Sequence, residues 1–128
     1  MKSNNLKTMS NKIDLSLKRV TIEDLKFEKI NRLVPVIAQD VNSGTILMLA
    51  YANLNALQKT METGFAHYWS RSRDTLWKKG ESSGNLQKIV EVLVDCDRDT
   101  LIYKVQQKGP ACHTGRQNCF FSKLIEKE

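Results

Sequence analysis

The alternation of apolar and polar residues along this chain predicts a protein built mostly of β-strands. From residue 33 onward, short runs rich in β-branched and aromatic residues are separated by Gly, Asn, Pro or charged positions. The predicted strands are 33–39, 45–51, 65–70, 75–79, 86–95 and 100–106.

Two of these runs carry further detail about turns and faces. Asn42-Ser43-Gly44 predicts a hairpin turn between the first two strands. In 86–95 the period of two predicts opposite faces, because successive side chains of a strand alternate. One face would hold Leu86, Val90, Val92 and Val94, and the other Gln87, Glu91 and Asp95.

One segment follows the helical period instead. Asn53 can cap a helix and Gly64 can end it. The apolar residues Leu54, Leu57 and Met61 then share one face, which we expect to be buried. A second, short helix is predicted near 22–30. The pattern as a whole predicts a mainly β, α+β fold with one main helix.

Composition and charge support a single domain. The 128 residues are 41% hydrophobic and 27% charged, which is ordinary for a globular chain of this length. We place a polar, flexible leader at 1–30 and one domain at 31–128. The net charge is +6, but residues 1–32 hold eight Lys and Arg against four Asp and Glu. Most of the basic excess therefore falls in the leader, and we expect no nucleic-acid partner.

The sequence also indicates a cytoplasmic protein. No apolar run approaches the ~20 residues that span a bilayer, so we expect no membrane partner. The N-terminus lacks the apolar core of a secretory signal. The three cysteines are an odd number, and disulfides are rare in the cytoplasm, so metal binding or catalysis explains them better.

Residues 94–121 hold all three cysteines and three carboxylates on alternate positions. If this stretch is extended, Asp95, Asp97 and Asp99 project to one face and Cys96 to the other. Clustered carboxylate oxygens suit Mg²⁺. Taken alone, however, a solvated acidic turn is the commoner use of such residues.

The thiols of Cys96, Cys112 and Cys119 favour zinc. Three thiolates leave a fourth position open for water, which is the arrangement of a catalytic zinc site. The spacing contains no CxxC pair, so three buried structural cysteines stay an alternative. His113 fits a fourth ligand, a general base or a surface residue. His67 fits a histidine packed within a strand.

A second polar concentration lies at 70–87. Arginine forks, hydroxyls and the backbone amides beside glycines are groups that phosphate oxygens prefer. A charged, solvated hairpin is the alternative, and Trp77 can either pack or stack on a base. The segment contains the cations Arg71, Arg73, Lys78 and Lys79, the hydroxyls of Ser70, Ser72, Ser82 and Ser83, and the glycines Gly80 and Gly84.

Three segments resemble the successive motifs of the phosphoribosyl-AMP cyclohydrolases, enzymes of histidine biosynthesis. They are SRSRDTLWKKGESSGN, VDCDRDTLIYKV and GPACHTGRQNCFF, in order and at family-like spacing within 33–121. The resemblance implies a homodimer whose mixed β-sheet folds on itself into a pseudobarrel. It also implies a hydrolase that opens the adenine ring of 1-(5-phosphoribosyl)-AMP at the N1–C6 bond.

The same resemblance assigns cofactors and site residues. It implies Mg²⁺ at Asp95, Asp97 and Asp99, and Zn²⁺ at Cys96, Cys112 and Cys119, with His113 as the candidate for proton transfer. We expect each zinc to be shared between two subunits, because Cys96 faces away from the aspartates on its strand and the resemblance points the same way. The candidate substrate contacts are Ser70, Arg71, Arg73, Trp77, Lys79, Glu81 and Ser82.

Two positions depart from the usual family pattern. Arg98 stands where Gly or Gln is usual and Asn118 where Ser or Thr is frequent, and neither is an expected ligand. Some relatives continue into a pyrophosphatase domain, whereas this chain ends at Glu128, so we expect a separate protein to supply that activity. Two other classes stay open: a structural-zinc module that binds nucleic acid, and an enzyme with a cysteine nucleophile.

Overall fold

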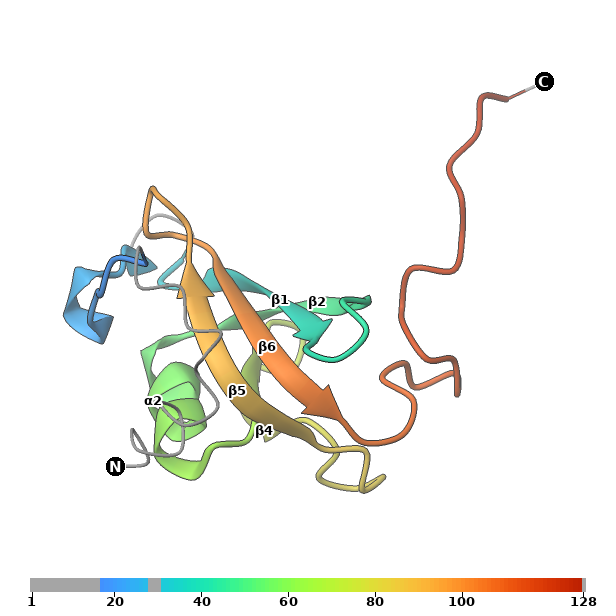
Figure 1. The fold of residues 1–128 in the computed structure, drawn as a ribbon, viewed down its shortest axis with the longest axis horizontal. Helices are drawn as coiled ribbons and strands as arrows, with labels where there is room; N and C mark the ends of the chain where they lie inside the picture. The colour runs from blue at the N-terminus through green and yellow to red at the C-terminus, as the bar shows by residue number, and fades with distance from the viewer. Residues whose placement is uncertain (1–16, 28–30, 128) are drawn as a thin grey trace.

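The computed structural model describes residues 17–27 and 31–127, which form two β-sheets and one α-helix (Figure 1). This confirms the prediction of a mainly β, α+β fold with one main helix. The elements are η2 (Ile22–Asp24), β1 (Val34–Asp40), β2 (Ile46–Ala52), α2 (Leu54–Thr63), β3 (His67–Ser70), β4 (Thr75–Lys78), β5 (Gln87–Val94) and β6 (Leu101–Gln107).

The larger sheet is mixed, as expected. Its strand order is β2-β1-β6-β5, with β1 parallel to β6 and the other neighbours antiparallel. The β3–β4 hairpin forms a second sheet, and one bridge between Phe65 and Lys88 links its start to β5. Over the described residues the hydrogen bonding is therefore not closed into a barrel.

The first hairpin forms through its turn residues. The Asp40 carboxylate accepts hydrogen bonds from the backbone amides of Asn42 and Ser43, and Gly44 adopts a left-handed φ of 76°. The backbone N–H of Asp40 also donates to the Thr45 carbonyl at 2.8 Å, which pairs the two ends of the turn. The predicted hairpin is confirmed, with the local side-chain bonds that such turns use.

The predicted faces of residues 86–95 hold after Val90, where Glu91 is exposed, and are wrong before it. The register of β5 against β6 shifts between Ile89 and Glu91, so the period of two changes phase at Val90. Ile89, Val92 and Val94 pack against the core. Gln87, which the pattern placed on the polar side, is fully buried, and its Oε1 accepts a 2.6 Å bond from the Tyr68 hydroxyl.

The helix begins and ends as predicted but buries another face. The Asn53 side chain accepts from the Ala56 amide at 2.8 Å, and Gly64 ends the helix with a φ of 78°. The buried residues are Ala56, Leu57 and Thr60, whereas Leu54 and Met61 are exposed. A threonine occupies the core face because its hydroxyl is satisfied there. It donates to the Ala56 carbonyl and accepts from the His67 amide in β3.

Part of the expected leader contacts the domain. Leu25 is buried in the core, and the Lys26 amide donates to the Arg98 carbonyl at 2.8 Å. Of the short helix predicted near 22–30, the structure has the 3-10 turn η2; residues 28–30, like 1–16, lie outside the described part of the chain. No helix within the described residues is long and apolar enough to cross a membrane.

Candidate active site

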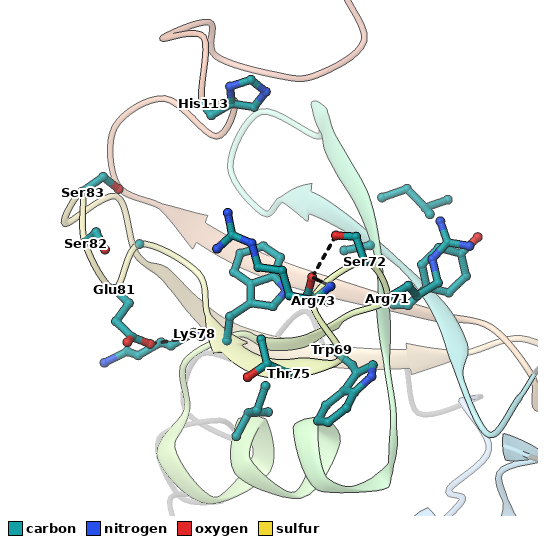
Figure 2. A pocket seen from close by; sticks show the side chains of 17 residues that line it. Trp69, Arg71, Ser72, Arg73, Thr75, Lys78, Glu81, Ser82, Ser83 and His113 are labelled. Carbon is teal, nitrogen blue, oxygen red and sulfur yellow. Dashed lines mark hydrogen bonds between the residues drawn. The ribbon is translucent and has the colours of Figure 1, made fainter.

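A cavity of about 1230 Å³ lies between β2, the β3–β4 hairpin and the loop that follows β4 (Figure 2). One wall comes from the C-terminal part of the chain, where His113 faces the cavity from the side opposite Trp69 and Thr75. Among the sequence-predicted residues, the lining includes Ser70, Arg71, Arg73, Trp77, Glu81, Ser82 and His113.

The cavity is basic and partly aromatic. Its cations are Arg71, Arg73 and Lys78, and the Glu81 carboxylate accepts a bond from the Lys78 backbone amide at 3.4 Å. The Arg71 guanidinium lies over the Tyr51 ring of β2, 3.9 Å from its centroid. Such a lining favours an anionic ligand with an aromatic part.

The lining also contains residues that the sequence analysis missed. Leu49 and Tyr51 reach the cavity from β2, and Trp69 and Thr75 come from the hairpin. The signal that was available is the run Ile46–Ala52, which is apolar on both faces of its strand, more than one buried face requires. The meeting of Leu49 and Tyr51 with the hairpin depends on the tertiary fold.

Lys79 is the one candidate substrate contact that does not line this cavity among the described residues. Its ammonium instead donates to the Ala111 carbonyl, just before Cys112. His67, by contrast, is where the sequence placed it. It is buried in β3, with Nδ1 2.8 Å from the Phe65 carbonyl oxygen.

The aspartate turn, residues 95–99, follows β5 directly. It is not extended, because the Arg98 amide closes a turn onto the Asp95 carbonyl at 3.0 Å and Arg98 has a φ of 64°. The turn still brings Asp95, Asp97 and Asp99 together, with ligand oxygens all within 4.8 Å of one another. The premise of an extended strand is wrong, but three hard oxygen ligands converge as a Mg²⁺ site requires.

The thiol loop, residues 110–119, follows β6. Backbone bonds from the Ala111 amide to Gln117 and from the Cys112 amide to Arg116 close the loop, both at 3.1 Å. The Cys119 amide donates to the Leu47 carbonyl in β2 at 2.8 Å. These bonds place the Cys112 and Cys119 thiols within hydrogen-bonding reach of each other.

The two thiols have different surroundings. The Thr114 hydroxyl donates to Cys112 Sγ at 3.0 Å and lowers the pKa of Cys112. Burial raises the pKa of Cys119, and the adjacent Cys112 thiol raises it further. Two adjacent thiols, one favoured as thiolate, are the soft donors that zinc prefers.

Cys96 lies apart from these thiols in the same chain. It sits in the aspartate turn before β6, whereas the thiol loop comes after β6, at its other end (Figure 1). The strand between has seven residues, which at ~3.3 Å each is about 20 Å. Within the described ranges 17–27 and 31–127, the aspartates are the only three acidic, His or Cys residues close enough to share a metal.

A cavity lined by arginines, serines and aromatic rings, with His113 of the thiol loop on one side, is suited to a phosphorylated small molecule. The comparison with known proteins specifies the class further. The family model of phosphoribosyl-AMP cyclohydrolase matches residues 48–121. The chain belongs to the phosphoribosyl-AMP cyclohydrolase family.

Individual relatives agree with this assignment. The chain is 58% identical over 101 residues to the phosphoribosyl-AMP cyclohydrolase of Archaeoglobus fulgidus, covering 79% of this chain and 93% of that protein. It is 62% identical over 93 residues to that of Methanothrix thermoacetophila, covering 73% and 77%. The histidine biosynthesis bifunctional protein HisIE of Aquifex aeolicus is 62% identical over 98 residues, which cover 76% of this chain and 47% of that protein.

Proposed function

We propose that this protein opens the adenine ring of 1-(5-phosphoribosyl)-AMP by hydrolysis of the N1–C6 bond. The product would be the formimino-aminoimidazole carboxamide ribotide intermediate of histidine biosynthesis. The observation that carries the proposal is the shared cavity, in which His113 of the thiol loop faces the arginines and serines of the β3–β4 region. One ligand can therefore contact the phosphate-binding groups and reach the thiol loop at once.

Different cavity residues would contact the phosphates and the purine of the substrate. Arg71 and Arg73 supply planar donors for phosphate oxygens, and Ser82 adds a hydroxyl. Trp77 offers an aromatic surface, held in place by the Tyr68 ring whose centroid lies 5.1 Å away. We assign Trp77 to the purine and the arginines to the phosphates. Fixing both ends would hold the reacting C6 at a set position.

The ligands on the chain fit the two expected metals. Cys112 and Cys119, with Cys96 from a partner subunit, would hold Zn²⁺, and the three carboxylates of the aspartate turn would hold Mg²⁺. Bound zinc would supply a water of lowered pKa. Asp95 also accepts bonds from the Asp99 and Thr100 amides, at 3.1 and 3.3 Å, which keeps its carboxylate oriented without metal.

His113 is our candidate for proton transfer. Its neighbour Cys112 is a proposed ligand, and the imidazole reaches the cavity from the loop that carries both. An imidazole can accept and release a proton near neutral pH. Opening the ring requires a proton at the departing N1, and His113 would lie on the thiol-loop side of the substrate to deliver it.

A homodimer would complete the zinc site. Cys96 is exposed at one end of β6 and the thiol loop lies at the other, so a two-fold axis could join the halves of two chains. Exposed apolar residues support an interface: Ile46 is 52% and Phe120 60% accessible. The segment after Cys119 also extends away from the sheets (Figure 1). The closed pseudobarrel and the cytoplasmic location remain part of this proposal.

The test is an absorbance assay with 1-(5-phosphoribosyl)-AMP. We expect turnover with Zn²⁺ and Mg²⁺ present, loss of turnover with a chelator, and recovery when zinc is restored. Absence of turnover in every condition would contradict the proposed reaction. Turnover that survives the chelator but stops on alkylation would instead indicate a cysteine nucleophile, and only the metal assignment would fall.

A further inference from the structure

Lys79 was expected at the substrate phosphates, but its contacts lie elsewhere. It begins the rim loop, residues 79–86, whose later members line the cavity. Its backbone amide donates to the Ala66 carbonyl at 3.0 Å, which fixes the start of this loop on the strand region before β3. Its side chain is half-buried and its Nζ is 6.0 Å from the centroid of the Trp77 ring.

The Lys79 ammonium is hydrogen-bonded to the thiol loop. It donates to the carbonyl oxygen of Ala111, a residue that is 1% exposed and precedes Cys112. A hydrogen bond from a charged donor to a buried carbonyl is among the stronger bonds in a protein.

Further contacts join the rim loop to the residues just before the thiol loop. The Lys108 amide donates to the Leu86 carbonyl at 2.9 Å, and the Gln107 side chain donates to the Asn85 carbonyl at 3.3 Å. Gly109 packs so closely on Asn85 that an added Cβ would lie 2.3 Å from its Oδ1. The rim loop is therefore attached to the chain on both sides of Gly109, and Lys79 makes the attachment nearest the thiols.

We propose that Lys79 is a positioning residue that anchors the thiol loop to the rim of the cavity, rather than a ligand of substrate phosphate. Its bond to Ala111 sets the position of Cys112 relative to the cavity. The inference rests on the proposed metal site at Cys112 and Cys119, and it concerns how this chain prepares that site.

The central experiment compares Lys79→Met, Lys79→Arg and Arg73→Ala. Methionine keeps the length and removes the donor, whereas arginine keeps charge and donors. Measured by chelator competition, Lys79→Met should bind Zn²⁺ about 10- to 100-fold more weakly, as is usual when a group supporting a metal ligand is lost. Lys79→Arg should recover most of the affinity. Arg73→Ala should show the reverse pattern, with a raised KM and an unchanged zinc affinity.

A second readout needs no metal and no turnover. In metal-free protein, the rate of alkylation of Cys112, compared at full ionisation of the thiol so that the lost Lys79 charge does not enter, should rise severalfold in Lys79→Met because the loop is released. The rate at Cys96 in the aspartate turn should not change. A Cys112 alkylation rate in Lys79→Met equal to that of the wild type, together with wild-type zinc affinity, would overturn the proposal. A raised KM in Lys79→Met would instead indicate that Lys79 binds the substrate phosphates. If the wild type binds no zinc, the proposed zinc site fails, but the alkylation rates still decide the role of Lys79.

Discussion

The aspartate turn and the thiol loop flank the same strand, yet they differ in how much of a ligand set each contains. The aspartate turn gathers its three carboxylates within five consecutive residues, through bonds made mostly between residues 95 and 100. A bond to a distant segment also runs from the Lys26 amide to the Arg98 carbonyl. The thiol loop contributes two thiols, and its third expected ligand, Cys96, lies beyond β6.

The difference shows which hydrogen bonds hold each of the two regions in place. The aspartate turn depends on local hydrogen bonds, such as those that Asp95 accepts from Asp99 and Thr100. The thiol loop depends on distant segments, through the Leu47 carbonyl that receives the Cys119 amide and the Lys79 ammonium. We therefore expect magnesium binding to change mainly with substitutions in the aspartate turn. Zinc binding should change also with substitutions in distant segments and with dimer formation.

The largest effects on activity are expected from substituting the cysteines and from mixing the inactive variants. Cys96→Ser and Cys112→Ser should each lose zinc and at least about 100-fold in activity, because a hard hydroxyl replaces a soft thiolate. In mixed dimers both lesions fall in one site and leave the other intact. An equal mixture should therefore regain about a quarter of wild-type activity, since half the dimers are mixed and each has one intact site.

The matched control is a mixture of Cys112→Ser with Cys119→Ser. Both lesions then affect the same half of the site, so neither site of a mixed dimer is complete and activity should stay absent. Mass spectrometry establishes that mixed dimers form. If they form in the first mixture and remain inactive, zinc is held within one chain and the contrast between the two regions is wrong.

Asp97→Asn should act on the aspartate turn alone. The change removes a charge and keeps the shape, so the Mg²⁺ concentration for half-maximal activity should rise about tenfold, which corresponds to about 1.4 kcal/mol. Zinc content should not change. Glu91→Gln, an exposed carboxylate on β5, is the control and should leave the magnesium dependence alone. An unchanged dependence in Asp97→Asn would make these residues a solvated acidic turn.

Gly109→Ala should act on the thiol loop from outside it. Gly109 has a φ of 68° and its new Cβ would force the Asn85 side chain to move. We expect a loss of about 2 kcal/mol in unfolding free energy and about threefold weaker zinc binding, with normal magnesium dependence. Gly115→Ala has a similar φ of 90° but no atom within 4 Å, so it measures the backbone strain alone. Equal effects of the two changes would show that the Asn85 contact does not matter.

The smallest effect is expected from Arg98→Gly. Arginine at a φ of 64° is strained and glycine is not, although glycine costs entropy in the unfolded chain. The net gain should be below about 1 kcal/mol, seen as a rise of a few degrees in melting temperature. The Lys26 bond to the residue-98 carbonyl is kept, and the magnesium dependence should change less than about twofold. A lower melting temperature would mean that the arginine side chain stabilises the turn.

The parts of the fold that follow from the sequence are those with local causes. The turn after Asp40 and the start of α2 were predicted because side chains there bond to nearby backbone, and the end of α2 because Gly64 allows a positive φ. The buried face of α2 and the first half of the β5 face were not predicted. The shift at Val90 arises in the pairing with β6, and the Thr60 hydroxyl accepts from the Tyr103 hydroxyl, which is also in β6. Polar residues enter a core when a remote partner is present, and periodicity alone does not reveal the partner.

The candidate site shows the same division. Residue types in the cysteine segment indicated metal ligands, and the aspartates do converge, although by a turn rather than by an extended strand. Lys79 and Arg73 are both cations of one polar segment, and the sequence treats them alike. Only the fold separates them, since Arg73 lines the cavity and Lys79 reaches Ala111.

The parallel pairing of β1 with β6 has a consequence for the order of folding. Val36 pairs with Leu101, 65 positions further along the chain, so the strand that both ligand-bearing regions flank joins the sheet only after a long loop closes. During synthesis, the β1–β2 hairpin and α2 can form while β6 is still inside the ribosome. Both the aspartate turn and the thiol loop therefore reach their places late, and the proposed zinc site would be complete only when the fold is nearly finished.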